Sequence, residues 1–237
     1  MGHLLAIRAV AVVFAAFSAI AYGIGDYCGG RSSRGADSFV ATFVGQLFSL
    51  VLLAFALVAF GDAVPPLRDW LWGAAGGVGG FIGLSLFYLA LSKGSMTVVA
   101  PLTAMVSSIL PVVAGVILGE RPNTLGFLGI VLALGGIALV TGAVGIAHQK
   151  TSASIALLAV LGGCGFGWMY VCLDRSHEEA GMWPLLGARI ASISIAGAVL
   201  LARRSDGPRF AGIGLLAMVA GLFDMAANIL FVVANHR

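Results

Sequence analysis

Charged residues are scarce in this chain of 237 residues, because Asp, Glu, Lys and Arg make up 10% of it, against about 25% in ordinary soluble domains. Apolar side chains make up 60% of the sequence before its 34 glycines are counted. This composition excludes a water-soluble globular fold. The net charge of +3 comes from scattered basic residues and not from a run that could follow a phosphate backbone, which argues against nucleic-acid binding.

Cysteine and histidine are also rare. Cys28, Cys164 and Cys172 form no CxxC pair and no cluster with histidine, so buried thiols are favoured over a metal or redox site. The four histidines lie near the ends of the chain or between apolar segments, and no HExxH or GxSxG motif is present. The sequence therefore predicts neither an enzyme nor a bound metal ion or cofactor.

Long apolar runs fill the chain and are separated by short polar turns. A helix needs about 20 apolar residues to cross a hydrocarbon core about 30 Å thick. Runs of about this length occupy residues 4–24, 38–60, 70–91, 95–118, 124–147, 154–173, 182–202 and 210–234. The sequence therefore predicts an all-α, multi-pass membrane protein with about eight transmembrane helices, in which short loops make sequential helices antiparallel neighbours.

Two parts of the sequence match weakly when one is shifted by 144 residues. This shift places Gly77 on Gly221 and Phe87 on Phe231. Each match is weak alone, but matches that share one offset across separate helices indicate an internal repeat.

The repeat divides the chain into two unequal copies. Residues 1–147 form a first repeat with five predicted helices, and residues 152–237 form a second repeat with three. Because five is odd, the second repeat enters the membrane from the opposite side, which is an inverted arrangement found mainly in transporters. We expect the second copy to be incomplete, lacking the counterparts of the last two helices of the first.

Polar residues recur on one face of each of the first four predicted helices. Spacings of three or four residues place each set on one side of its helix. The sets are Ser18, Tyr22 and Asp26; Thr42, Gln46 and Ser49; Ser85, Tyr88 and Ser92; and Thr103, Ser107 and Pro111. Such residues either line a shared cavity or join helices by bonding backbone carbonyls, and four sets in succession favour the cavity.

Arg189 and Asp224 are the charged residues expected well inside predicted helices, where a charge costs about 2.5 to 3.5 kcal/mol. In an antiparallel pair of helices their depths differ by about 5 Å, which an arginine side chain can cover. Asn228, one turn beyond Asp224, would complete the cluster. The pair either fixes helix register or serves the solute, with Arg189 holding a carboxylate and Asp224 carrying a proton.

Trp168 stands in an aromatic-rich part of the sixth predicted helix. It would stack on an aromatic or cationic ligand, or else belong to the core or to the aromatic belt at the membrane interface.

Residues 92–140 resemble a known transporter segment. They read SKGSMTVVAPLTAMVSSILPVVAGVILGERPNTLGFLGIVLALGGIALV, in which a proline-containing helix is followed by a Gly-Glu-Arg turn and a glycine-rich helix. This order resembles the end of the first repeat in EamA-type members of the drug/metabolite transporter superfamily. The resemblance implies ten helices in two inverted repeats around a central cavity that moves small metabolites such as amino acids.

These observations predict a multi-pass transporter of the cell membrane that moves a small metabolite by alternating access. The alternative is a truncated membrane protein that does not transport, or an assembly partner. The expected partners are a small-molecule solute and the lipid bilayer, with a homo-oligomer or complementing helices left open. The residues expected to contact the solute are Tyr22, Gln46, Tyr88, Ser107, Trp168, Arg189, Asp224 and Asn228.

Overall fold

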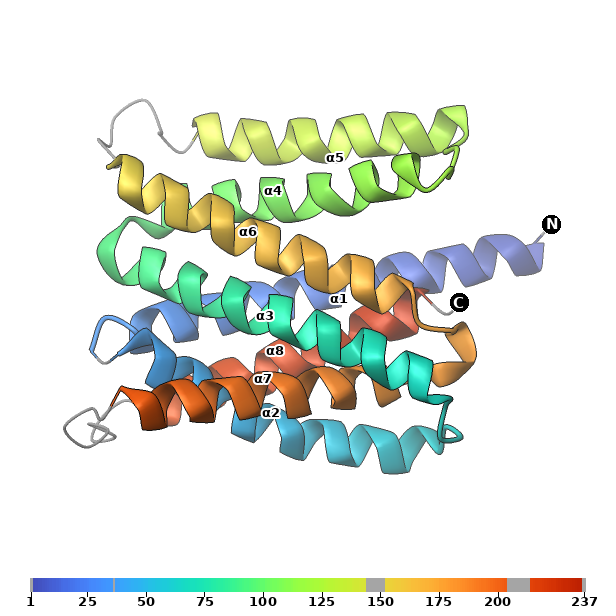
Figure 1. The fold of residues 1–237 in the computed structure, drawn as a ribbon. Coiled ribbons are helices and arrows are strands. Elements are labelled where there is room, and N and C mark those ends of the chain that lie inside the picture. The colour runs from blue at the N-terminus through green and yellow to red at the C-terminus, as the bar shows by residue number, and fades with distance from the viewer. Residues whose placement is uncertain (1, 36, 144–151, 204–213, 236–237) are drawn as a thin grey trace.

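The computed structural model describes residues 2–35, 37–143, 152–203 and 214–235. These residues form eight α-helices and one short 3-10 helix, with no strand among them (Figure 1). The α-helices are α1 (Gly2–Ser32), α2 (Ser38–Phe60), α3 (Leu67–Lys93), α4 (Met96–Ile117), α5 (Thr124–Ala143), α6 (Ala153–Asp174), α7 (Trp183–Ala202) and α8 (Gly214–Asn235). The predicted all-α fold is confirmed.

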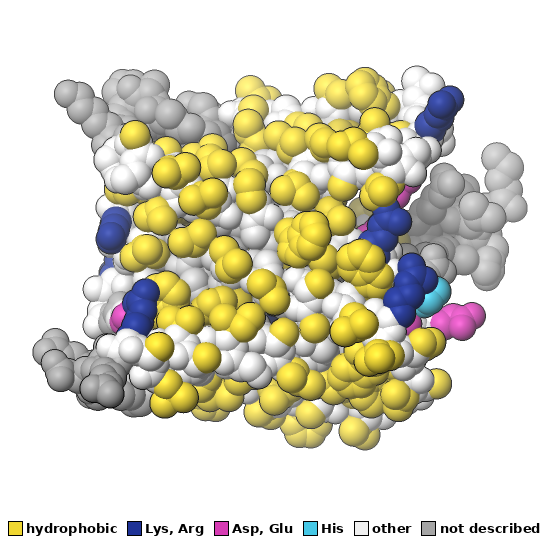
Figure 2. All heavy atoms as spheres, viewed as in Figure 1, with side chains coloured by type: hydrophobic (Ala, Val, Ile, Leu, Met, Phe, Trp, Pro, Cys, Tyr) yellow, Lys and Arg dark blue, Asp and Glu magenta, His cyan; other side chains and the backbone are white. Residues whose placement is uncertain are grey.

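Seven of the described helices are long and apolar enough to cross a membrane. The exception is α5, whose apolar stretch is described over Thr124–Leu139. Its predicted span, 124–147, ends in residues 144–147, which lie outside the described ones. The beginning of the predicted span 210–234 lies outside them as well. Figure 2 shows hydrophobic side chains across the middle of the visible face and basic side chains toward its two ends, as in a protein that crosses a bilayer.

Helix α1 continues beyond the end predicted from the sequence, and reaches Ser32. The prediction ended the span before Gly25 because glycines and polar residues cluster there as they do in turns. In the structure these glycines admit neighbouring helices: a Cβ on Gly25 would lie 3.3 Å from an α8 carbonyl oxygen, and one on Gly29 would overlap the ring of Tyr88. Asp26 belongs to the polar face of the first predicted helix but lies past the predicted end of that span at residue 24, and the structure places it within α1.

Helices α3 and α8 each lie along two other helices of the bundle. Helix α3 lies along α6 and α7, and α8 lies along α1 and α2. Both crossings depend on glycine, because a Cβ on Gly77 would overlap the carbonyl of Ala188 in α7, and a Cβ on Gly221 would overlap the carbonyl of Gly45 in α2. Figure 1 also shows that α1 and α3 run in the opposite direction to α6 and α8.

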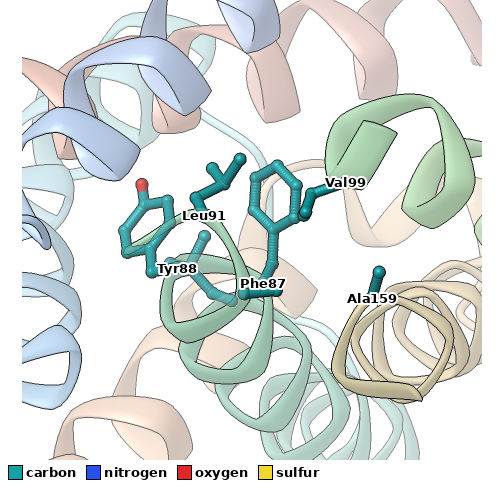
Figure 3. Packing of buried hydrophobic residues seen from close by; sticks show 7 residues of the cluster. Phe87, Tyr88, Leu91, Val99 and Ala159 are labelled. Atoms are coloured by element: carbon teal, nitrogen blue, oxygen red, sulfur yellow. The ribbon is translucent and has the colours of Figure 1, made fainter. Parts of the chain in front are cut away.

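An apolar core joins α3 to α4 and α6. Phe87, Tyr88, Leu91, Val99 and Ala159 belong to one buried cluster. Figure 3 shows that Phe87 points toward Val99 of α4, whereas the neighbouring Tyr88 leaves α3 on another side. This core fixes α3 in the middle of the bundle, where it can form a wall of the cavity described below.

The turn after α4 needs its glycine for a conformational reason. Gly119 begins the Gly-Glu-Arg-Pro turn and has a φ angle of 94°, which side-chain-bearing residues rarely adopt. Pro122 follows within this turn, before α5 begins at Thr124. The motif that carries the family resemblance is thus the sharp reversal between α4 and α5.

At one end of the bundle, the first turn of α3 and the turn before it are bonded to the segment between α6 and α7. The carboxylate of Asp69 is buried and accepts hydrogen bonds from the backbone N–H of His177, at 3.0 Å, and lies 3.0 Å from its Nδ1. Asp62 accepts a bond from the backbone N–H of Met182 at 3.1 Å, and the indole of Trp183 donates to the Asp62 carbonyl at 3.0 Å. These bonds tie the start of α3 and the turn before it to the segment that leads into α7.

Candidate functional site: a cavity between both parts of the chain

A cavity of about 860 Å³ opens between helices of the bundle, because Ala19, Gly23 and Ala104 of its lining are exposed. Its volume is within the size range of small-molecule sites. Its walls come from α1, α3, α4 and α5, and from α6 and α8 in the C-terminal part of the chain. The polar and charged lining residues are Tyr22, Asp26, Thr103, Ser107, Ser108, Tyr170 and Asp224. Aromatic and small apolar side chains form most of the remaining wall.

Helix α1 lines the cavity with part of its predicted polar face. Tyr22 and Asp26 are one turn apart and both border the cavity. The Tyr22 hydroxyl is buried and meets no partner with good hydrogen-bond geometry among the described residues, although the Tyr170 hydroxyl is its neighbour. Ser18, on the same face, instead donates to the carbonyl of Ala227 in α8 at 2.8 Å. The polar face of α1 therefore contributes both to helix packing and to the cavity wall.

Polar residues of α4 also both bond to backbone carbonyls and line the cavity. Thr103 donates to the Ala159 carbonyl of α6 at 3.1 Å, and Ser107 donates to the Ala104 carbonyl of its own helix at 3.0 Å. Both also line the cavity. Pro111 lacks an N–H and cannot bond the carbonyl of Ser107, so α4 is locally weakened beside the cavity.

The predicted contact between Arg189 and Asp224 is confirmed. Arg189 Nη2 lies 2.6 Å from Asp224 Oδ2, and Nη1 donates to Oε1 of Gln46. Ser192 donates to the same Gln46 oxygen at 3.1 Å. The guanidinium, whose residue is only 8% exposed, is thus enclosed by acceptors from α2 and α8, as a buried charge requires.

Asn228 completes this cluster in a way that the sequence did not indicate. Its Nδ2 donates to the backbone carbonyl of Asp224 at 2.8 Å, and no bond to the Asp224 carboxylate is found among the described residues. Asn228, Gln46 and Arg189 border a void of about 20 Å³ that is separate from the large cavity. Asp224 lies at the boundary, because it lines the cavity while its carboxylate binds Arg189.

The structure brings six of the eight predicted site residues into one region. Three line the cavity, namely Tyr22, Ser107 and Asp224. Three lie behind Asp224, namely Gln46, Arg189 and Asn228.

The other two predicted site residues lie elsewhere. Tyr88 is 3% exposed and its ring packs against Gly29 of α1, outside the cavity lining. Trp168 is 47% exposed on the outside of α6 and donates to the Ala75 carbonyl of α3 at 3.1 Å. Spacing along a helix predicts which residues share a face, but not whether that face meets a cavity, another helix or lipid.

The sequence prediction of the site missed Asp26 and most of the aromatic wall. Phe87, Phe166, Tyr170 and Phe231 line the cavity. A signal was present for Asp26, which follows Tyr22 by one turn, and for Phe87 and Phe231, which coincide when the sequence is shifted by 144 residues.

A second hollow of about 300 Å³ adjoins the cavity toward one end of the bundle. Pro111, Tyr170 and Phe231 border both spaces, and the rings of Tyr170 and Phe231 are 5.4 Å apart. The hollow extends to charged residues at the helix ends, including Glu120 and Arg175. The aromatic pair thus stands between the cavity and a space that reaches the polar end of the bundle.

The sequence profile of the EamA-like transporter family matches residues 9–142. The chain belongs to this family. The match covers α1 to nearly the end of α5, and therefore includes the α1 and α4 walls of the cavity. Membership also places this EamA-like protein in the drug/metabolite transporter superfamily, and together with the seven apolar helices it indicates a multi-pass membrane transporter. A search of curated proteins gives no match.

Proposed function

We propose that this EamA-like protein moves a small metabolite across the cell membrane by alternating access, with the central cavity as the solute site. The carrying observation is a cavity of about 860 Å³ that is walled by helices from both parts of the chain and holds two carboxylates inside membrane helices. Ionisable groups at such depth are costly, and where they persist they commonly mark solute or ion pathways. Tyr22, Ser107 and Asp224 would contact the solute.

Arg189, Gln46 and Asn228 have a positioning role in this proposal. Arg189 holds Oδ2 of Asp224, and Gln46 holds Arg189. Asn228 bonds the backbone at Asp224. Together they would fix one carboxylate at the cavity wall, whether or not that carboxylate also carries a proton.

An inverted repeat of residues 1–147 and 152–237 would supply the movement. Gly77 and Gly221, which are 144 residues apart, have the same role at the α3–α7 and α8–α2 crossings, and this equivalence supports the repeat. The opposite directions of α1 and α6 agree with it (Figure 1). Two such units can rock about a central site and expose it to each side in turn.

Filling the cavity should stop transport without unfolding the protein. Gly23 lines the cavity and has open space around its Cβ position, so we expect Gly23→Phe to project a ring into the cavity and reduce flux at least about tenfold. Gly129 in α5 also has open space there but does not line the cavity, so Gly129→Phe is the matched control. The measurement is counterflow of radiolabelled solutes into proteoliposomes containing the purified full chain.

The flux of the Gly23→Phe protein relative to that of the Gly129→Phe protein decides whether the cavity is the solute site. If Gly23→Phe protein is monodisperse and transports as fast as Gly129→Phe protein, the solute does not pass through this cavity. Absence of flux in the unmodified chain for every solute tried would contradict transport by this chain alone.

A second candidate function, as one part of an assembly, is favoured by an open surface on α1. Three small residues of α6 lie where α4 crosses it, namely Ala159, Gly163 and Gly167. A shift of 144 residues aligns them with Ala15, Ala19 and Gly23, which are exposed on α1. Ala19 and Gly23 also border the cavity, so this surface continues into the cavity opening. Small residues at this spacing let helices approach closely.

A second copy of the chain is the proposed occupant of this α1 surface. If the two repeats are inverted relative to each other, a helix packed on this surface would run opposite to α4. Helix α5 runs opposite to α4 and is apolar and largely exposed, so the α5 of a second copy could pack there. Light scattering of purified protein should then show a dimer, and Ala15→Phe should convert it to a monomer. A monomeric unmodified chain would contradict the assembly.

A further inference from the structure

We infer that the cavity selects organic cations, namely small molecules that carry an ammonium group on an aromatic or alkyl body. This inference rests on the proposed function for its biological meaning, but concerns binding, which can be measured separately. The described charged residues of the cavity wall are all of one sign. Among the described residues that border the cavity, two are acidic, Asp26 and Asp224, and none is Lys, Arg or His.

The two carboxylates differ in what they bind. Asp224 is paired with Arg189 at 2.6 Å, so its charge is compensated within the protein. Asp26 has no hydrogen bond or ion pair with any described residue, and lies in electrostatic range of Asp224. An isolated carboxylate among apolar helices costs free energy that a bound cation would offset. The described wall therefore offers a carboxyl group whose charged form a bound cation would stabilise.

The aromatic wall favours the same ligand class. Tyr22, Phe87, Phe166, Tyr170 and Phe231 line the cavity, and ring faces attract ammonium groups. Their rings also provide apolar contact for the body of an amphipathic solute. The cavity volume of about 860 Å³ leaves room for such a body beside the charged group.

The position of Arg189 argues against anions and against zwitterions such as free amino acids. A substrate carboxylate would need a cationic partner, and the Arg189 guanidinium borders the small void while both of its terminal nitrogens meet acceptors of the protein. A carboxylate in the cavity would instead approach the unpaired carboxylate of Asp26, which repels it. The ammonium end of a zwitterion is accommodated, but its carboxylate is not.

The test uses four probes of similar size that differ in charge. They are benzyltrimethylammonium, its uncharged carbon analogue neopentylbenzene, phenylacetate and phenylalanine. Binding to the purified full chain is measured by displacement of radiolabelled benzyltrimethylammonium, in detergent. We expect unlabelled benzyltrimethylammonium to displace the label at a concentration at least about tenfold lower than each of the other probes. One charge-assisted contact is strong enough to give a difference of this size.

Substitutions of Asp26 test whether this residue binds the ammonium group. Asp26→Asn should weaken cation binding at least about tenfold, whereas Asp26→Glu, which keeps the charge, should retain the preference over the neutral analogue. Asp174→Asn is the matched control, because it removes an exposed carboxylate that lies outside the cavity lining. Thermal unfolding of each variant separates lost binding from lost folding, and if Asp26→Asn does not fold, Asp26→Glu and the four-probe comparison decide.

Three results overturn the cation assignment. They are saturable binding that Asp26→Asn leaves unchanged, equal or better binding of phenylacetate or phenylalanine, and no saturable binding of the cation at millimolar concentration. Flux of the same probes into proteoliposomes distinguishes this failure from failure of the proposed function. If phenylalanine crosses and the cation does not bind, transport stands and the cation assignment falls. If the cation binds through Asp26 and no probe crosses, the assignment stands and transport falls.

Discussion

Gly77→Leu and Gly221→Leu should each prevent recovery of folded protein. A Cβ at either position would overlap a backbone carbonyl of the crossing helix, Ala188 in α7 or Gly45 in α2, and backbone cannot turn aside as a side chain can. The helices would have to separate along their length. Overpacking of an ordinary core costs about 1 to 3 kcal/mol, and a clash with backbone in each of these crossings should exceed that and approach the whole stability of about 5 to 15 kcal/mol.

Size-exclusion chromatography and thermal unfolding in detergent measure this effect. Gly129→Leu is the control, because a Cβ at Gly129 meets open space, and we expect it to remain monodisperse with a nearly unchanged melting temperature. Similar losses at Gly77 and Gly221 would fit their equivalence in the proposed repeat. A monodisperse Gly221→Leu protein that melts with the unmodified chain would show that α2 and α8 do not cross as closely as described.

Arg189→Ala should destabilise the protein by about 3 to 5 kcal/mol, because it removes one partner of a buried ion pair and leaves a carboxylate uncompensated. Asp224 loses a contact of 2.6 Å, and Gln46 loses a donor. Adding Asp224→Asn to Arg189→Ala should recover part of the loss, because the remaining amide carries no charge. The measurement is a double-mutant cycle on thermal or denaturant unfolding in detergent micelles.

The coupling between these two positions is the decisive quantity of the cycle. We expect it to exceed about 1 kcal/mol, as for residues in direct contact. Additive effects of the two substitutions would contradict the ion pair. Transport by the refolded double variant would further show that the pair has a structural role and does not serve the solute directly.

The sequence predicted the helices well because a membrane-spanning helix requires a long run of apolar residues, which is visible in the sequence. Long apolar runs and short polar turns located all eight, and helix rise alone predicted that Arg189 reaches Asp224. The predicted end of α1 was wrong because glycines such as Gly25 and Gly29 occur in two different settings. Glycine marks turns, and it also admits a neighbouring helix, and only the positions of α8 and Tyr88 distinguish these uses.

The candidate site was only partly predictable for a related reason. Periodicity correctly grouped Tyr22 with Asp26, and Thr103 with Ser107, all of which border the cavity. The same periodicity grouped Ser85 with Tyr88, whose ring packs against α1. A polar or aromatic stripe gives the direction of a side chain from its helix, whereas the neighbour in that direction depends on how all the helices pack.

The most direct measurement of the central claim asks whether the cavity holds water inside the membrane. Ser107→Cys and Gly129→Cys are placed separately in a chain whose Cys28, Cys164 and Cys172 have been replaced by serine, and intact proteoliposomes are treated with a membrane-impermeant methanethiosulfonate. Such reagents attack thiolates, which form in water and not in lipid. We expect rapid modification at position 107, which borders the cavity, and very slow modification at position 129, which does not. Equal and very slow modification at both positions would contradict a solvent-accessible solute site between these helices.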